Sequence, residues 1–196
     1  PRDYGRETDL TPLEAEVSCE MEVSMPTFLL GFKCPPMSGG QEQMRRTLIG
    51  ELACDVLLGD SSPLYARLYS QGLINGTFGY SFDTLPGVAY AYIGGDSKDP
   101  HAVAEEVLQE ARRLVKDGID PDYYARIVRA NYGSTLKSLN SFESIAISLV
   151  EGQFEGYDPL LFPEMFDSIT PQDLLAFIRE NLCREHMALS VVYPKE

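Results

Sequence analysis

Residues Leu57–Thr84 read LLGDSSPLYARLYSQGLINGTFGYSFDT and contain the clearest local structural signals in this chain. Ser62 followed by Pro63 is typical of a helix start, because the serine oxygen accepts from open amides and proline fits the first helical position. The residues after Pro63 predict a short amphipathic helix, and Thr77–Thr84 alternates as a strand does. The stretch contains no histidine or cysteine, so it offers no metal ligand of those types.

Alternation of apolar and polar residues predicts strands on both sides of this stretch. We expect five strands, near residues 16–24, 27–34, 76–84, 88–95 and 187–193. In the first, Val17, Cys19 and Met21 alternate with acidic and polar residues, which predicts a half-buried strand with an acidic outer face. A turn around Leu85-Pro86-Gly87 joins the third and fourth strands, and we expect a loop longer than the tight two-residue kind.

Helices are predicted by apolar spacing and by capping residues. In residues 41–58 an apolar residue recurs every four positions, which predicts a long helix. Five capping residues precede a proline and predict five helix starts; they are Ser62-Pro63, Asp99-Pro100, Asp120-Pro121, Asp158-Pro159 and Thr170-Pro171.

Strands and helices that are mixed without strict alternation favour an α+β class. We expect two layers, an antiparallel sheet covered by helices on one face. Residues 14–196 are predicted to form a single domain, preceded by a polar linker or arm at residues 1–13. The chain begins at Pro1 without a methionine or signal-like segment, so we expect a processed or cut fragment.

The charge of the chain restricts its partners. Lys and Arg number 16 against 30 Asp and Glu, a formal net charge of −14. This field repels phosphate backbones, so we expect no nucleic-acid partner. No apolar run approaches the roughly 20 residues of a membrane span, so no membrane partner is expected.

Cysteines and histidines give no catalytic or metal pattern. Cys19, Cys34, Cys54 and Cys183 form no C-x-x-C pair, and we expect reduced buried thiols in a cytoplasmic protein. His101 and Glu105 share a helical spacing, but two ligands do not hold a catalytic metal. With His186 far away in sequence, we predict no metal site and no catalytic residue in this chain.

Three segments in order resemble one peptidase family. GDSSPLYARLYSQGLINGTFGYSFD resembles the S-S-x-L-(F/Y)-x-x-L…G-L segment in the second half of zinc peptidases of the pitrilysin and insulin-degrading type and of processing peptidases. FDSITPQDLLAFIRENL (166–182) followed by ALSVVYP (188–194) is similar to the closing helix and strand of that family, and the helical residues 120–146 also fit. The resemblance covers about residues 14–194.

The resemblance implies a division of labour between two homologous halves that enclose a chamber. The first half carries H-x-x-E-H and holds zinc, with the motif glutamate as general base. This chain lacks that inverted zinc motif, so it matches the second half, and the resemblance implies zinc, an N-terminal zinc-binding half or homologous subunit, and a peptide substrate. The implied protein is a zinc-dependent metallopeptidase, a hydrolase that is not active as this fragment alone.

The second half of this family usually supplies an arginine and a tyrosine that hold the substrate. Here Tyr69 occupies the arginine position after Leu68, and the tyrosine position falls on Ile74 or Asn75. Either other residues contact the substrate, or a partner subunit supplies the pair. We therefore expect Tyr69 and Asn75 to be the substrate-binding residues, although packing alone would also explain Tyr69.

Two other hypotheses remain open. The chain could be a non-catalytic scaffold or partner subunit of a peptidase-like complex, which the sequence upstream of Pro1 would decide. It could also be an unrelated α+β binding domain, which a different fold would support.

Overall fold

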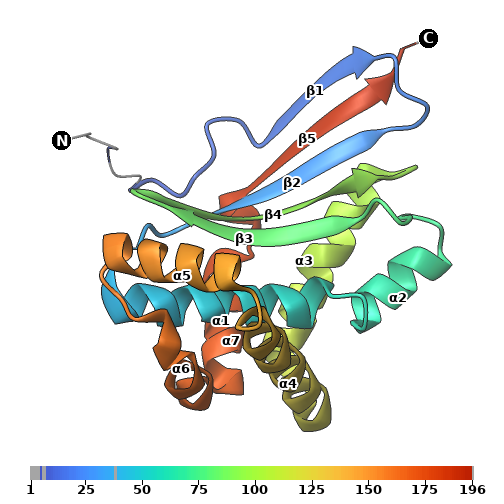
Figure 1. Ribbon diagram of the computed structural model, residues 1–196. Coiled ribbons are helices and arrows are strands. Elements are labelled where there is room, and N and C mark those ends of the chain that lie inside the picture. Colours follow the sequence, from blue (N-terminus) through green and yellow to red (C-terminus); the bar gives the residue numbers. More distant parts are fainter. Residues whose placement is uncertain (1–4, 6–7, 38, 196) are drawn as a thin grey trace.

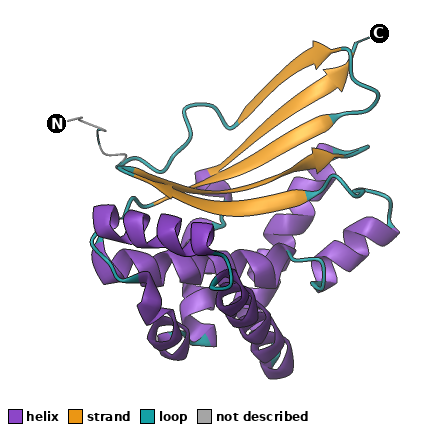
Figure 2. Cartoon of the chain, viewed as in Figure 1, coloured by secondary structure: helices purple, strands orange, loops and turns teal. Residues whose placement is uncertain are grey.

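A computed structural model describes residues 5, 8–37 and 39–195 of the chain. Among these residues a single sheet of five strands lies on a layer of seven α-helices, which cover one face of the sheet (Figures 1 and 2). The strands are β1 (Glu16–Met21), β2 (Thr27–Cys34), β3 (Gly79–Leu85), β4 (Val88–Asp96) and β5 (Met187–Pro194). The predicted α+β two-layer class is confirmed.

Seven α-helices and two short 3-10 turns occur in the described part of the chain. They are α1 (Gly40–Leu58), α2 (Pro63–Ser70), α3 (Pro100–Asp117), α4 (Pro121–Ser138), α5 (Phe142–Glu155), α6 (Phe162–Ser168) and α7 (Pro171–Asn181), with short 3-10 turns η1 (Pro159–Leu161) and η2 (Arg184–His186). Residues 1–4 and 6–7 of the predicted arm lie outside the described residues, and residues 8–13 form no helix or strand.

The sheet is antiparallel except at one edge. Its strand order is β1-β5-β2-β4-β3, and β1 pairs with β5 in parallel. The first two strands are close in sequence, yet they do not pair, because the last strand lies between them. Met187, Leu189 and Val191 of β5 are buried, which an interior position in the sheet allows. The expectation of an antiparallel sheet is therefore wrong for this one edge.

The prediction of a half-buried first strand is also wrong. Every residue of β1 is exposed, including Val17 at 47% and Met21 at 55%. β1 is an edge strand that extends beyond the helical layer (Figure 1). Alternation predicts an apolar face, but burial of that face requires another element against it, and none of the described residues supplies one.

The turn between β3 and β4 is tighter than expected. Leu85 pairs with Val88, so only Pro86 and Gly87 form the loop. Gly87 has φ of 84°, and proline followed by such a glycine is the pattern of a type II turn. The prediction of a longer loop is wrong.

Capping residues identify most helix starts correctly. The side chains of Ser62, Asp99, Asp120 and Thr170 accept from the first-turn amides of α2, α3, α4 and α7. Asp158 caps only the 3-10 turn η1. The predicted helical stretch 120–146 is divided at residues 139–141, where Ser141 caps the separate helix α5.

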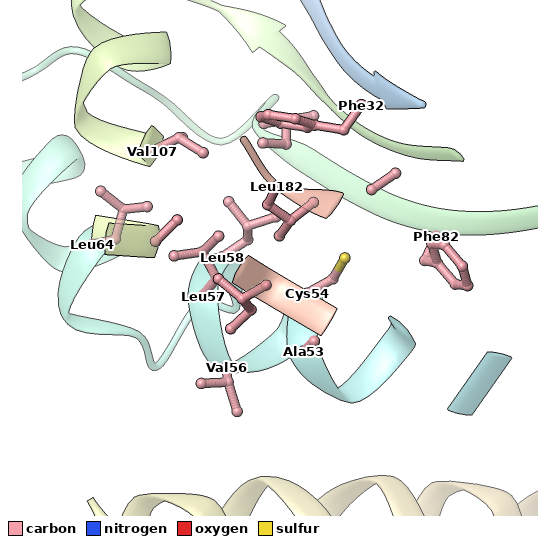
Figure 3. Close-up of a cluster of buried hydrophobic side chains, with 14 of the residues drawn as sticks. Phe32, Ala53, Cys54, Val56, Leu57, Leu58, Leu64, Phe82, Val107 and Leu182 are labelled. Atoms are coloured by element: carbon pink, nitrogen blue, oxygen red, sulfur yellow. The ribbon is translucent and has the colours of Figure 1, made fainter. Parts of the chain in front are cut away.

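The core lies between the sheet and α1, α3 and α7. Figure 3 shows Phe32 and Phe82 of the sheet above Leu57 and Leu58 of α1, with Leu182 nearby. Gly50 of α1 allows close packing, because a β-carbon there would lie 2.4 Å from the Phe82 ring. This continuous cluster fixes the helix layer to one face only of the sheet.

All four cysteines are free thiols. Cys34 and Cys54 are buried, and burial raises the pKa of the Cys34 thiol to about 12 and that of Cys54 well above its usual value. Cys183 is partly buried. Cys19 is exposed on β1, so its predicted burial is wrong for the same reason as that strand's.

Candidate functional site

Tyr69 lies in the last turn of α2 and is 56% exposed. Its ring stacks on Tyr65 with 5.9 Å between centroids, and Tyr65 contacts the edge of Phe78 at 5.8 Å. Tyr65 and Phe78 pack against the core, so they support Tyr69 from one side. The Tyr69 ring is held in place yet keeps much of its surface available for contact.

Asn75 shapes the connection between α2 and β3. Its Oδ1 accepts from the backbone amide of Thr77 at 2.8 Å and from the Thr77 hydroxyl at 2.6 Å. Asp96, at the end of β4, donates its backbone amide to the same Thr77 hydroxyl at 2.9 Å. These bonds occupy the Asn75 carbonyl oxygen and orient its amide nitrogen, which lies 3.9 Å from Met25 Sδ.

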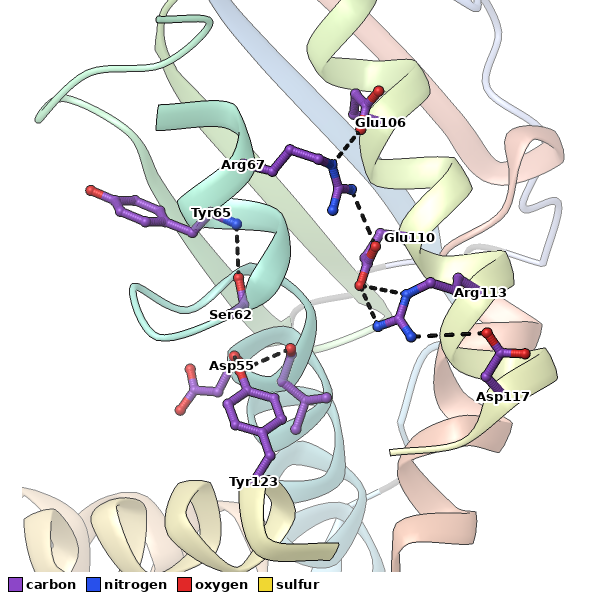
Figure 4. Close-up of polar contacts among 10 residues, drawn as sticks. Asp55, Ser62, Tyr65, Arg67, Glu106, Glu110, Arg113, Asp117 and Tyr123 are labelled. Atoms are coloured by element: carbon purple, nitrogen blue, oxygen red, sulfur yellow. Dashed lines mark hydrogen bonds and ion pairs between the residues drawn. The ribbon is translucent and has the colours of Figure 1, made fainter. Parts of the chain in front are cut away.

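Arg67 is held by carboxylates and is not free to bind a substrate. Its guanidinium donates to Glu106 at 3.0 Å and to Glu110 at 3.2 Å, both on α3 (Figure 4). Glu110 also accepts from Arg113, with a shortest distance of 2.6 Å. Arg67, the arginine nearest the family position, therefore joins α2 to α3.

Glu110 is only 3% exposed and is compensated on both sides. Burial raises the pKa of a carboxyl, but the hydrogen bonds and charges of Arg113 and Arg67 outweigh this and lower the pKa of Glu110. The group is thus a buried, ionised anchor of the α2–α3 contact.

A second polar cluster surrounds Asp55 of α1. Tyr80 donates its hydroxyl to Asp55 Oδ1 at 2.9 Å, and Asn131 donates to Oδ2 at 2.6 Å. Tyr123 donates its hydroxyl to the carbonyl of Val56 at 3.1 Å. Burial and then the Asp55 charge raise the pKa of Tyr80 strongly. These tyrosines remain protonated, and the cluster fastens β3 and α4 to α1.

The sheet face opposite the helices carries a groove of about 650 Å³. The side chains of Leu29, Tyr90 and Tyr92 line it, with Lys33 and His186 beside them. The Tyr90 and Tyr92 rings lie 6.1 Å apart. Residues 12–14, before β1, form one border.

This groove was not identified from the sequence. Alternation over residues 88–93 indicates that Tyr90 and Tyr92 share one face of the strand. It does not indicate which face of the sheet the helices leave open. His186 Nδ1 is buried there without a hydrogen-bond partner among the described residues.

The histidines do not form a metal centre. His101 Nε2 lies 3.4 Å from Glu16 Oε1 and 3.4 Å from the Tyr193 hydroxyl, whereas Glu105 pairs with Arg184. Across residues 5, 8–37 and 39–195, no group of three or more His, Cys, Asp or Glu side chains could hold a metal ion. Zinc therefore does not fit this part of the chain. No helix in the described part is long and apolar enough to cross a membrane.

Comparison with known proteins gives a consistent family. The model of the peptidase M16 inactive domain matches residues 1–131. A Bacillus subtilis protein described as uncharacterized zinc protease YmfH is 30% identical over 183 residues, which are 92% of this chain and 42% of that protein. The chain therefore spans less than half of this relative.

Solved structures with low identity share the fold. An M16-like peptidase from Alicyclobacillus acidocaldarius superposes with a TM-score of 0.88 at 22% identity, over 95% of this chain and 45% of that one. The inactive peptidase domain of a zinc protease from Bordetella parapertussis gives a TM-score of 0.73 at 15% identity, over 91% and 95% of the two chains.

Proposed function

Because this chain belongs to the peptidase M16 inactive-domain family, we propose that it forms the non-catalytic half of a zinc-dependent peptidase. The zinc and its general base would come from an N-terminal half of the same protein or from a homologous subunit. The resemblance to pitrilysin-type and processing peptidases stated from the sequence is thereby confirmed at the level of the family. The hypothesis of an unrelated α+β domain is wrong.

One observation carries this proposal: the sheet has a helix-covered face and an open face that bears an apolar, tyrosine-lined groove. A sheet usually buries one face and leaves the other to water. The open face here exposes Leu29 at 50% and two neighbouring tyrosines, which suits contact with a polypeptide better than with water alone. We propose that this face forms one wall of a peptide chamber.

Tyr69 and Asn75 are proposed to contact the substrate from the connection between α2 and β3. Tyr69 offers an exposed ring supported by Tyr65, and aromatic rings gain contact area at a low entropic cost. Asn75 offers an amide nitrogen whose side chain is already oriented by Thr77. The net charge of −14 favours basic or extended peptides, with an effect that weakens as salt rises.

The experiment uses the product of the complete reading frame that contains this chain. Tyr69→Ala and Asn75→Ala are expected to lower kcat/KM for a fluorogenic peptide about tenfold, with little change in thermal stability. Phe154→Ala is the matched control, because this ring is 86% exposed on α5, and it should leave turnover unchanged. Unchanged turnover in both variants would remove the α2–β3 connection from the substrate site.

The alternative is a non-catalytic scaffold or partner subunit of a peptidase-like complex. Zinc analysis of the same full-length product distinguishes the two. One zinc per chain together with peptide cleavage supports the peptidase, whereas a metal-free product that cleaves no peptide supports the scaffold.

A further inference from the structure

A cavity of about 580 Å³ lies between the helical layer and the turn that joins β3 and β4, and neither Tyr69 nor Asn75 lines it. Helices α1, α4, α5 and α6 and the turn between β3 and β4 surround it. Its walls combine polar side chains with apolar ones, and the apolar ones include Met44, Leu48, Ile145, Leu149 and Phe162. This volume is within the range of about 300–1,000 Å³ that is typical of small-molecule sites.

Helix α5 covers this cavity without filling it. Only Gly152 of its 14 residues is buried, although the helix contains many apolar side chains. The C-terminal end of α5 packs closely at Gly152, because a β-carbon there would lie 2.6 Å from the Tyr157 carbonyl oxygen. At the same end, the Gln43 amide of α1 donates a hydrogen bond to Glu155. The apolar residues Ile145 and Leu149 line this space.

The charges around the cavity have one sign. Glu51, Glu151 and Glu155 line it, whereas no Lys, Arg or His does among the described residues. The Gln43 amide binds Glu155, but Glu51 and Glu151 form no hydrogen bond or ion pair with the described part of the chain. Glu51 also lies in the field of Asp55 and Asp83, which adds to the negative potential.

We propose that this cavity binds a small ligand with an apolar body and one protonated amine. The body would displace water from the leucine and phenylalanine side chains of the walls, which favours binding because apolar surface is removed from water. The ammonium group would lie beside Glu51, a carboxylate on a cavity wall to which the described residues contribute no Lys, Arg or His. The same chemistry is offered by a free arylalkylamine and by the N-terminus of a short hydrophobic peptide.

The test uses this chain, 4-phenylbutylamine as the probe and two ligands of similar shape. The neutral probe is 4-phenylbutan-1-ol and the anionic probe is 4-phenylbutyrate. Amide chemical shifts from two-dimensional NMR report where each ligand binds and with what dissociation constant. We expect the amine to change the amide chemical shifts of residues in α1 and α5 and to bind about fivefold tighter than the alcohol. The carboxylate should not bind. Equal affinities for amine and alcohol would overturn the proposal.

Variants assign the effect to the cavity. Glu51→Gln should weaken amine binding about fivefold and leave alcohol binding unchanged. Glu143→Gln removes the same charge from exposed α5 surface outside the cavity, and it should change neither affinity. Leu149→Trp fills the space and should abolish binding of both ligands. Binding that survives Leu149→Trp in a folded variant would overturn the assignment to this cavity.

A second comparison separates the two ligand sources. Leu-Phe-amide with a free N-terminus is compared with its N-acetyl form. Binding of the free peptide with loss on acetylation identifies a peptide N-terminus as the source, whereas binding of 4-phenylbutylamine alone identifies a free amine. Absence of cavity shifts with every probe would overturn the proposal.

Discussion

Helices α3 and α5 use apolar residues in opposite ways. The apolar residues of α3 lie along one stripe, and Val103, Val107 and Leu108 are buried against the core. Those of α5 lie around the whole helix, and Phe142 and Phe154 are 92% and 86% exposed. Apolar content therefore does not decide burial. A helix is stabilised by the packing of one face, and α5 instead covers a cavity.

The largest expected effect tests this contrast with two leucines. Leu108→Ala on α3 should lower the free energy of unfolding by about 2–5 kcal/mol, because it leaves a cavity in a packed core. Leu149→Ala on α5 should cost less than about 1 kcal/mol, because this leucine is 43% exposed and borders an existing cavity. Urea unfolding of both variants measures the difference. Similar losses would show that α5 is packed as firmly as α3.

The next effect concerns the charged side of α3. Glu110→Gln should cost about 1–3 kcal/mol at pH 7, since Arg67 and Arg113 lose a buried charged acceptor. The lowered pKa of Glu110 means that this stabilisation is present above the ordinary value of 4.5 and is lost as pH falls through the lower folded value. The gap between wild type and variant should therefore narrow on acidification. Glu143→Gln is the exposed control, and a gap that is independent of pH would contradict this assignment.

The smallest expected effect on stability is that of Glu51 on α1, which lines the cavity beside α5. Burial, with the charges of Asp55 and Asp83, raises the pKa of Glu51 from 4.5 to about 7. The folded state then holds a proton that the unfolded state releases, so the stability contributed by Glu51 falls as pH rises from about 4.5 to 7. Glu51→Gln should therefore increase stability at pH 8 relative to wild type. The Glu51 side chain is solvent-accessible through the cavity, so the gain should stay below about 1 kcal/mol.

Thermal unfolding of wild type and Glu51→Gln at pH 5 and pH 8 checks this expectation. The two proteins should be most similar at pH 5. A destabilised variant at pH 8 would show that the Glu51 carboxylate has a favourable partner in the fold.

Local signals predicted much of the fold because their causes are local. The caps at Asp99 and Asp120 accept from amides three residues away, and no distant residue is needed. The strands near residues 27–34 and 88–95 were likewise predicted from short local patterns, and they are β2 and β4. The short helix predicted after Pro63, which contains Tyr69, is α2 for the same reason. The role of Tyr69 in substrate binding stays a prediction.

The sequence by itself determined the class of elements, their approximate limits, the family resemblance and the absence of an H-x-x-E-H motif. Only the tertiary structure decided that β5 separates β1 from β2, that Arg67 is bound by Glu106 and Glu110, and that α5 covers a cavity. These three features join residues that are tens of positions apart. Periodicity and capping depend on residues that are a few positions apart. The three features above depend on how the sheet packs against the helices, and no short stretch of sequence specifies that packing.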